Sequence, residues 1–206
     1  ITNEIPMTGQ TQLRAGSVSK SITAAVVLQL VDSGMLDLDA PVSDYITDLD
    51  FDDGFGPPST IGQLLTHTSG YEGKVMGSHS PDLASTESLA EVLHSDLPPR
   101  AFPPGMVASY SDWNYSLLGH AVEQVTGIPY PQAAEQIIFS PLGMVRSTFN
   151  QPLPVPILSD LAVGYGWKYS TGSYEEVPHD FVRLLPGIGL VTNGDDMGTF
   201  MRAVLS

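Results

Sequence analysis

Residues 15–34 read AGSVSKSITAAVVLQLVDSG, and this stretch decides the fold. Its apolar residues recur at helical spacing, with one row formed by Ile22, Val26 and Leu30. Gly34 follows as a typical C-terminal cap, because glycine adopts the left-handed conformation that ends many helices. The spacing therefore predicts a buried helix that begins near Ser17 and runs to Ser33.

Ser17 and Lys20 put a hydroxyl and an amine on one face at the start of this helix. A serine needs an adjacent base to act as a nucleophile, and a lysine serves only if burial or nearby positive charge keeps it neutral. The apolar helix supplies part of that burial. The amide of Ser17, at the positive end of the helix, is a candidate donor to an oxyanion. An SxxK pattern alone often arises by chance, and Ser19 is then an N-terminal cap without a catalytic role.

The composition is that of one globular domain. The chain has 206 residues, of which 42% are apolar, and this is enough for one sizeable core. We expect a single domain over residues 1–206. The longest apolar runs, such as Ile22 to Val31, are too short to span a bilayer, and no basic end precedes an apolar stretch at the N-terminus. We therefore expect a soluble chain with neither a membrane span nor an export signal.

Charge and residue usage exclude several classes of function. The formal charge is −15, from 23 acidic and 8 basic residues, and such a chain repels nucleic acid and anionic membranes. The absence of cysteine excludes disulfides, thiolate metal sites and a cysteine nucleophile. The histidines show no HExxH or other short metal-binding spacing, and they are His67, His79, His94, His120 and His179. We expect neither a metal nor a cofactor.

Capping and turn residues indicate the remaining elements. Thr60 and Gln63 have the spacing of a capping box, for a short helix that ends near His67. Helical patterns occupy four later segments, which are 86–94, 115–125 (stopped by Gly127), 131–139 and 195–205 (with Asn193 as candidate cap). Alternation predicts strands over 161–169 and 174–177, joined by a Thr171-Gly172 hairpin loop. Four prolines between Leu97 and Gly105 predict a tight loop that leads to Tyr110.

A series of short motifs surrounds the serine. SVSK at 17–20 is followed by LLTHTSG at 64–70, PG at 104–105, YSD at 110–112, YSLLG at 115–119, PLGM at 141–144, GIGL at 187–190 and DM at 196–197. In these motifs, over nearly its whole length, the chain resembles the active-site serine hydrolases of the β-lactamase and penicillin-binding-protein type. The resemblance is to the group of class C β-lactamases, related esterases and D-amino-acid-specific peptidases. It implies an α+β fold of the β-lactamase/D,D-peptidase type. We expect mostly its helical region with a few strands, and parts of the sheet missing at both ends.

The resemblance also implies roles for individual residues. Ser17 would form the acyl-enzyme, and Lys20 would activate it or stabilise its alkoxide. Tyr110 would pass the proton to the leaving group and later help to activate water. A tyrosine has an ordinary pKa near ~10, so its use as a base needs a nearby cation, which Lys20 supplies. Asp112 and Gly189 would contribute to substrate binding.

His67 is a second candidate partner for the serine, as in a Ser-His pair. The resemblance puts it in a structural turn, and it has no suitable acidic group to orient it, so we expect a hydrogen-bonded core histidine. The sequence contains no GxSxG, and an α/β-hydrolase nucleophile elbow is therefore not supported.

The chain departs from the family pattern at Asp112, where many relatives carry asparagine. Asparagine donates a hydrogen bond to a substrate carbonyl, whereas an ionised aspartate only accepts and favours a protonated Lys20. We expect Asp112 to weaken the binding of β-lactams and ordinary peptide carbonyls and to tolerate esters or amine-bearing substrates better.

The late KTG or HxG motif of the family is absent from this sequence, and its strand would supply the second oxyanion amide and one wall of the cleft. The resemblance implies a hydrolase that acts through an acyl-enzyme on an ester, amide or lactam in a small-molecule or peptide substrate, working in the periplasm or outside the cell. The alternative is a catalytically inactive fragment or a non-enzymatic binding module of the penicillin-binding-protein type. The sequence leaves the oligomeric state open.

Overall fold

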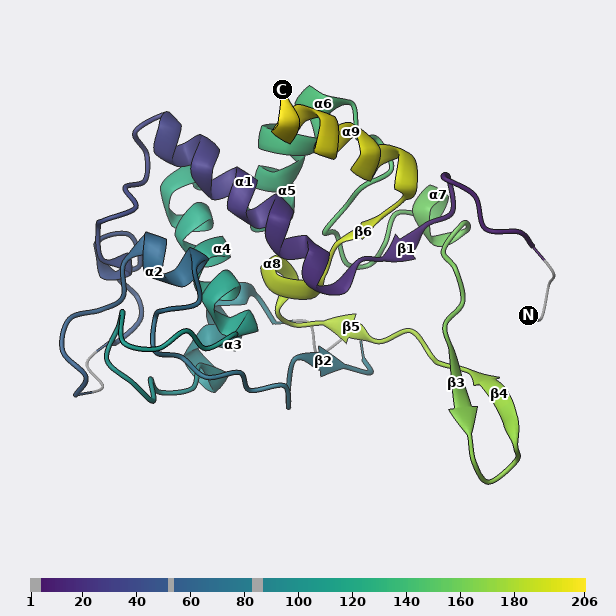
Figure 1. The fold of residues 1–206 in the computed structure, drawn as a ribbon, viewed down its shortest axis with the longest axis horizontal. Helices are drawn as coiled ribbons and strands as arrows, with labels where there is room; N and C mark the ends of the chain where they lie inside the picture. The colour runs from purple at the N-terminus through teal and green to yellow at the C-terminus, as the bar shows by residue number, and fades with distance from the viewer. Residues whose placement is uncertain (1–4, 52–53, 83–86) are drawn as a thin grey trace.

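The computed structural model describes residues 5–51, 54–82 and 87–206, and helices dominate this part of the chain (Figure 1). The α-helices are α1 (Ser19–Asp32), α2 (Ile61–Leu65), α3 (Leu89–Asp96), α4 (Asp112–Thr126), α5 (Tyr130–Ala134), α6 (Ser140–Leu142), α7 (Val155–Leu158), α8 (Leu185–Ile188) and α9 (Gly194–Leu205). Three short turns of other helix types accompany them, which are η1 (Gly16–Val18), η2 (Val42–Asp44) and the π-helical η4 (Glu135–Phe139).

Helix α1 is the central buried helix that the sequence predicts. Ile22, Val26 and Val27 are fully buried, and the helix packs against α4, α5 and α8 (Figure 1). Gly34 has φ +76° just after the C-terminus, as expected of a glycine cap. The helix differs from expectation at its start, where Ser17 lies in the 3₁₀ turn η1 and α1 begins at Ser19.

Side-chain caps begin three of the other helices. Thr60 accepts a hydrogen bond from the amide of Gln63 and forms the predicted capping box of α2. Ser88 does the same for α3, which therefore begins at Leu89, later than the expected position 86, a residue that lies outside the described part. Asn193 accepts from the amide of Asp196 and caps α9 as expected. These side-chain caps determine the residues at which α2, α3 and α9 begin.

Two further helices also differ from the expected bounds. Helix α4 begins at Asp112 and not at position 115, because Asp112 is already in its first turn, where an acidic side chain is favourable. Gly127 ends it with φ +72°, as expected. The helix expected over 131–139 is split, since α5 gives way at Glu135 to the π-helical turn η4.

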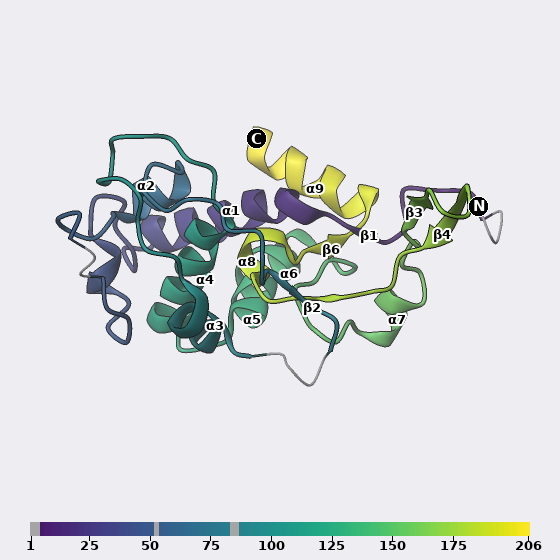
Figure 2. The same ribbon diagram turned by 90° about the horizontal axis from the view of Figure 1, so that it is seen from below.

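The strands form three separate antiparallel pairs. β1 (Leu13–Arg14) pairs with β6 (Val191–Thr192), β2 (His79–Ser80) with β5 (Phe181–Val182), and β3 (Tyr165–Lys168) with β4 (Ser173–Glu176). The expected strand over 161–169 is too long, because Leu161 makes only an isolated bridge to Gln12. The predicted hairpin is confirmed as β3–β4, which projects from the end of the molecule opposite α2 (Figures 1 and 2).

Candidate active site

The structure brings Ser17, Lys20 and Tyr110 together. Tyr110 Oη donates a hydrogen bond of 2.6 Å to Ser17 Oγ, although the two residues are 93 positions apart. Lys20 Nζ lies 3.4 Å from the same oxygen. Ser17 and Tyr110 are exposed, whereas Lys20 retains only 7% of its accessible surface. The hydroxyl therefore faces outward, with the two proton-carrying groups beside it.

Lys20 Nζ has three oxygen partners. It forms an ion pair of 2.5 Å with Asp112 Oδ1, donates to the carbonyl of Gly187 at 2.9 Å, and makes the longer contact to Ser17. Three acceptors match the three hydrogens of an ammonium group. The Nζ atom also lies 4.7 Å from the centre of the Tyr110 ring, so a positive charge sits beside the phenol.

Asp112 lies in this site because α4 begins there. Its side chain is 20% exposed and turns toward Lys20, as the sequence argument on charge expects. A carboxylate in this position only accepts hydrogen bonds, and its nearest donor is the lysine. The contact spans 92 residues of sequence, so helical spacing alone does not reveal it.

The GIGL segment contributes through backbone atoms. Gly187 supplies the carbonyl that Lys20 contacts, and a Cβ atom on it would approach the Asp112 carbonyl at 3.2 Å. Glycine thus allows α8 to lie close to the start of α4. Gly189, the residue predicted to bind substrate, is the C-cap of α8, and its N–H donates to Leu185 O at 2.9 Å. Its role in substrate binding stays a prediction.

A buried hydrogen-bond network lies beneath Lys20, one turn further along α1. Thr23 Oγ1 is 2.6 Å from the carbonyl of Pro186 and 2.5 Å from Tyr130 Oη, and both side chains are fully buried. Burial raises the pKa of the Tyr130 phenol, which keeps it as a neutral donor. Thr23 and Lys20 therefore contact two successive carbonyl groups of α8, those of Pro186 and Gly187.

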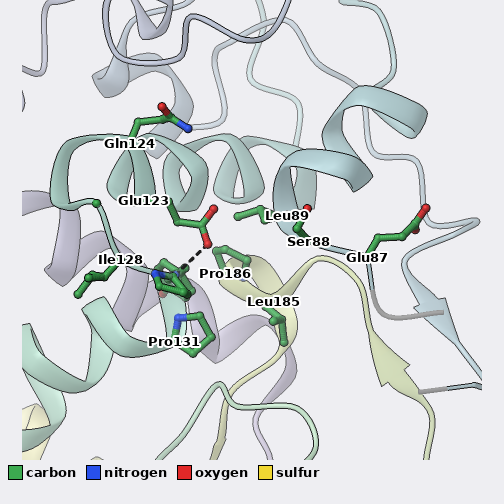
Figure 3. A pocket seen from close by; sticks show the side chains of 12 residues that line it. Glu87, Ser88, Leu89, Glu123, Gln124, Ile128, Pro131, Leu185 and Pro186 are labelled. Atoms are coloured by element: carbon green, nitrogen blue, oxygen red, sulfur yellow. Dashed lines mark hydrogen bonds between the residues drawn. The ribbon is translucent and has the colours of Figure 1, made fainter. Parts of the chain in front are cut away.

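A cavity of about 600 Å³ lies beside the same helix but outside this site (Figure 3). Leu185 and Pro186 line it, together with the carboxylate of Glu123, which accepts the amide hydrogen of Tyr130 at 2.9 Å (dashed in Figure 3). Ser17, Lys20 and Tyr110 are not among the lining residues. The three predicted catalytic residues are therefore gathered around the exposed Ser17 hydroxyl and not around this cavity.

Neither a metal cluster nor a membrane-spanning helix is found within the described ranges. No three His, Asp or Glu side chains there are grouped so that they could hold a metal ion. In the same part of the chain, no helix is long and apolar enough to cross a bilayer.

The chain belongs to the beta-lactamase family, whose sequence model matches residues 1–206. Penicillin-binding protein 4 of Amycolatopsis lactamdurans is 35% identical over an alignment of 147 positions that covers 69% of this chain and 37% of that protein. Esterase EstB of Burkholderia gladioli is 37% identical over an alignment of 159 positions that covers 68% of this chain and 38% of the esterase. The resemblance predicted from the motifs is thus confirmed.

Solved structures agree with this family. The D-amino acid amidase of Ochrobactrum anthropi SV3, in complex with L-phenylalanine amide, superposes with a TM-score of 0.82 at 25% sequence identity. The match covers 99% of this chain and 58% of the amidase. The predicted fold of the β-lactamase and penicillin-binding-protein type is therefore confirmed. The chain spans less than half the length of the two curated relatives described above.

Proposed function

We propose that the protein is a serine hydrolase that acts through an acyl-enzyme on an ester, amide or lactam. The observation that carries this proposal is the contact of Ser17 Oγ with both Tyr110 Oη, at 2.6 Å, and Lys20 Nζ, at 3.4 Å. A serine hydroxyl becomes a useful nucleophile when a proton acceptor and a stabilising charge lie within such distances.

In the proposed acylation step, Lys20 acts as the cation and Tyr110 as the proton carrier. The three oxygen partners of Lys20 support a charged ammonium, which would stabilise a phenolate on Tyr110 once Tyr110 has lost the hydrogen that it donates to Ser17 in the structure. The phenolate takes the proton of Ser17 Oγ while this oxygen bonds to the substrate carbonyl carbon. The bond from that carbon to the leaving group then breaks, and Tyr110 returns the proton to the leaving group.

Deacylation uses the same groups in reverse. Tyr110 removes a proton from water, the water oxygen bonds to the acyl carbon, and Ser17 Oγ leaves and takes the proton back. Ser17 lies in the first turn of the η1–α1 segment, where backbone N–H groups lack helical acceptors. Its amide is our candidate donor to the oxyanion that forms in both steps.

We further propose that Asp112 directs the choice of substrate toward esters or amine-bearing substrates and away from β-lactams and ordinary peptide carbonyls. Its carboxylate is held by Lys20 at 2.5 Å and has no hydrogen to donate to a substrate carbonyl. A protonated amine on the substrate could pair with the Asp112 carboxylate as a second cation beside Lys20.

The family resemblance also favours work in the periplasm or outside the cell, and we propose this as the location of the whole protein.

Intact-mass analysis after incubation with a fluorophosphonate, and separately with a penicillin, tests the proposal. We expect one adduct per chain with the fluorophosphonate and none in Ser17→Ala. The reagent that reacts narrows the substrate class. A folded protein that gains no mass with either reagent would contradict hydrolase function and favour a non-enzymatic binding module.

A further inference from the structure

His67 has an unusual backbone conformation for its residue type. It follows α2 with φ +57°, and among the described residues it is the one non-glycine position with a positive φ. The left-handed region is costly for most side chains, although Asn, Asp and His enter it more readily than others. Such a conformation persists only where the surroundings hold it, and here the surroundings are the segment that carries Tyr110.

Three contacts join His67 to that segment. The carbonyl of His67 accepts the amide hydrogen of Ser109 at 2.8 Å, and its Nδ1 accepts the amide hydrogen of Ser111 at 3.2 Å. Between these two bonds, the imidazole ring packs on the Tyr110 ring with centroids 4.5 Å apart. One residue therefore holds the backbone on both sides of Tyr110 and the face of its phenol.

The neighbouring hydrogen bonds fix the tautomer of His67. Asn114 Nδ2 lies 3.1 Å from His67 Nδ1, and Asn114 Oδ1 accepts from Ser69 Oγ at 2.6 Å. Because Asn114 Oδ1 is engaged by a hydroxyl donor, its amino group is the atom that faces the imidazole. Nδ1 thus accepts from two donors, the amide of Ser111 and the side chain of Asn114. The ring hydrogen of the neutral imidazole is on Nε2.

We propose that His67 is a positioning residue that holds Tyr110 Oη against Ser17 Oγ, and that it does so only as a neutral imidazole. This inference rests on the proposed function, because it assigns His67 a part in the work of Tyr110. Within the described residues His67 forms no hydrogen bond with Ser17, and in this proposal it takes no proton in the reaction.

The charge environment of His67 agrees with a neutral ring. Burial lowers the pKa of His67, and the nearby Lys20 ammonium lowers it further, while Asp112 acts in the opposite direction. The other titratable groups that face the ring are the phenols of Tyr110 and Tyr115, at centroid distances of 4.5 and 5.3 Å. Protonation would put a hydrogen on Nδ1, opposite two donors, and would break its hydrogen bonds with the Ser111 amide and the Asn114 side chain. Activity should therefore fall on the acid side, below the ordinary imidazole pKa of about 6.5.

Two variants of His67 distinguish the effect of its hydrogen bonds to the Tyr110 segment from the effect of ring packing alone. His67→Asn tolerates the left-handed backbone and has an Oδ1 atom where Nδ1 lies, but it cannot titrate. His67→Gly keeps the backbone conformation and removes both the acceptor and the ring. We expect His67→Gly to lower kcat on a chromogenic ester by about tenfold to a hundredfold with KM little changed. We expect His67→Asn to retain more activity and to lose the acid limb of the pH profile that belongs to His67.

A control variant and a second measurement complete the test. Val92→Ala removes fully buried methyl groups on α3 and reports what general destabilisation does to turnover. Spectroscopic titration of the Tyr110 phenol, taken as the difference from Tyr110→Phe, needs no turnover, and we expect His67→Gly to shift it. A wild-type protein that does not react would contradict the proposed function and would leave the role of His67 to the Tyr110 titration. An unchanged Tyr110 titration in His67→Gly, or an unchanged acid limb in His67→Asn, would overturn the role of His67. If His67→Gly does not fold, the His67→Asn profile still decides the matter.

Discussion

Thr23 offers a test of the network beneath Lys20 that needs no knowledge of the substrate. Replacing Thr23 by valine leaves the side-chain volume nearly unchanged but removes a hydroxyl that bonds to Pro186 O at 2.6 Å and Tyr130 Oη at 2.5 Å. Both partners then remain buried without a hydrogen bond. Each such group costs about 1–3 kcal/mol, and two of them cost roughly 2–6 kcal/mol. We take about 3 kcal/mol as the expected loss of unfolding free energy.

The expected loss is large enough to measure by thermal unfolding. A chain of this length loses roughly 2–4 °C of Tm per kcal/mol, so Thr23→Val should lower Tm by about 6–12 °C. Tyr130→Phe should cost less, about 1 kcal/mol, because Thr23 keeps its bond to Pro186. Circular dichroism followed against temperature and urea gives both values. Thr148→Val is the matched control, since Thr148 is also buried and, among the described residues, its hydroxyl accepts only from the Asn150 amide.

The double variant Thr23→Val/Tyr130→Phe decides whether the two hydroxyls are coupled. Removing the tyrosine hydroxyl also removes one of the two unpaired groups, so the double variant should be more stable than the sum of the single losses predicts, by about 1–2 kcal/mol. Losses that simply add would refute the reasoning, because they would mean that the two side chains do not depend on each other.

Two further predictions concern charged groups. Asp112→Asn should raise the rate of acylation by a penicillin, relative to an ester, by about fivefold to tenfold, since an amide donor to the substrate carbonyl is gained; equal ratios in both proteins would rule out a part for Asp112 in substrate choice. His120 is buried between Asp48 and Glu123, and although burial disfavours its charge, the hydrogen bonds to both carboxylates raise its pKa. Its stabilising effect is fully present below the unfolded pKa of about 6.5 and is lost as pH rises through the folded value, so Tm should fall over that window in the wild type. His120→Gln should flatten this part of the profile, and a slope that persists in the variant would assign the effect to other groups.

Local signals in the sequence predicted much of the fold. The glycine caps at Gly34 and Gly127, the capping box of Thr60 and the apolar rows of α1 depend on neighbours within a few positions, and the structure has them where expected. The expected bounds failed where tertiary contacts decide them. Asp112 reads as a loop residue after a proline-rich run, yet it starts α4 because Lys20 and the helix N-terminus both favour its charge.

The candidate site divides in the same way. Ser17 and Lys20 could be paired from their helical spacing, and Tyr110 was predicted from the family motif. No local pattern reveals that Gly187 accepts from Lys20 across 167 residues, or that His67 binds the backbone beside Tyr110. The GIGL motif marked the segment of Gly187, but Gly187 contributes through its backbone carbonyl, and every residue has such a group, so the sequence cannot identify this contact. Our expectation that His67 is a hydrogen-bonded residue agrees with its contacts to Ser111 and Asn114, but its side chain is half-buried and does not lie in the core.

The burial of Lys20 has a practical consequence for chemical modification. The chain has three lysines, and the side chains of Lys74 and Lys168 are 41% and 52% exposed against 8% for Lys20. Amine-directed reagents should therefore react first with Lys74 and Lys168, because Lys20 is buried and its amine contacts three oxygen atoms. Immobilisation or fluorescent tagging through lysine should leave the Ser17 site open to its reagents.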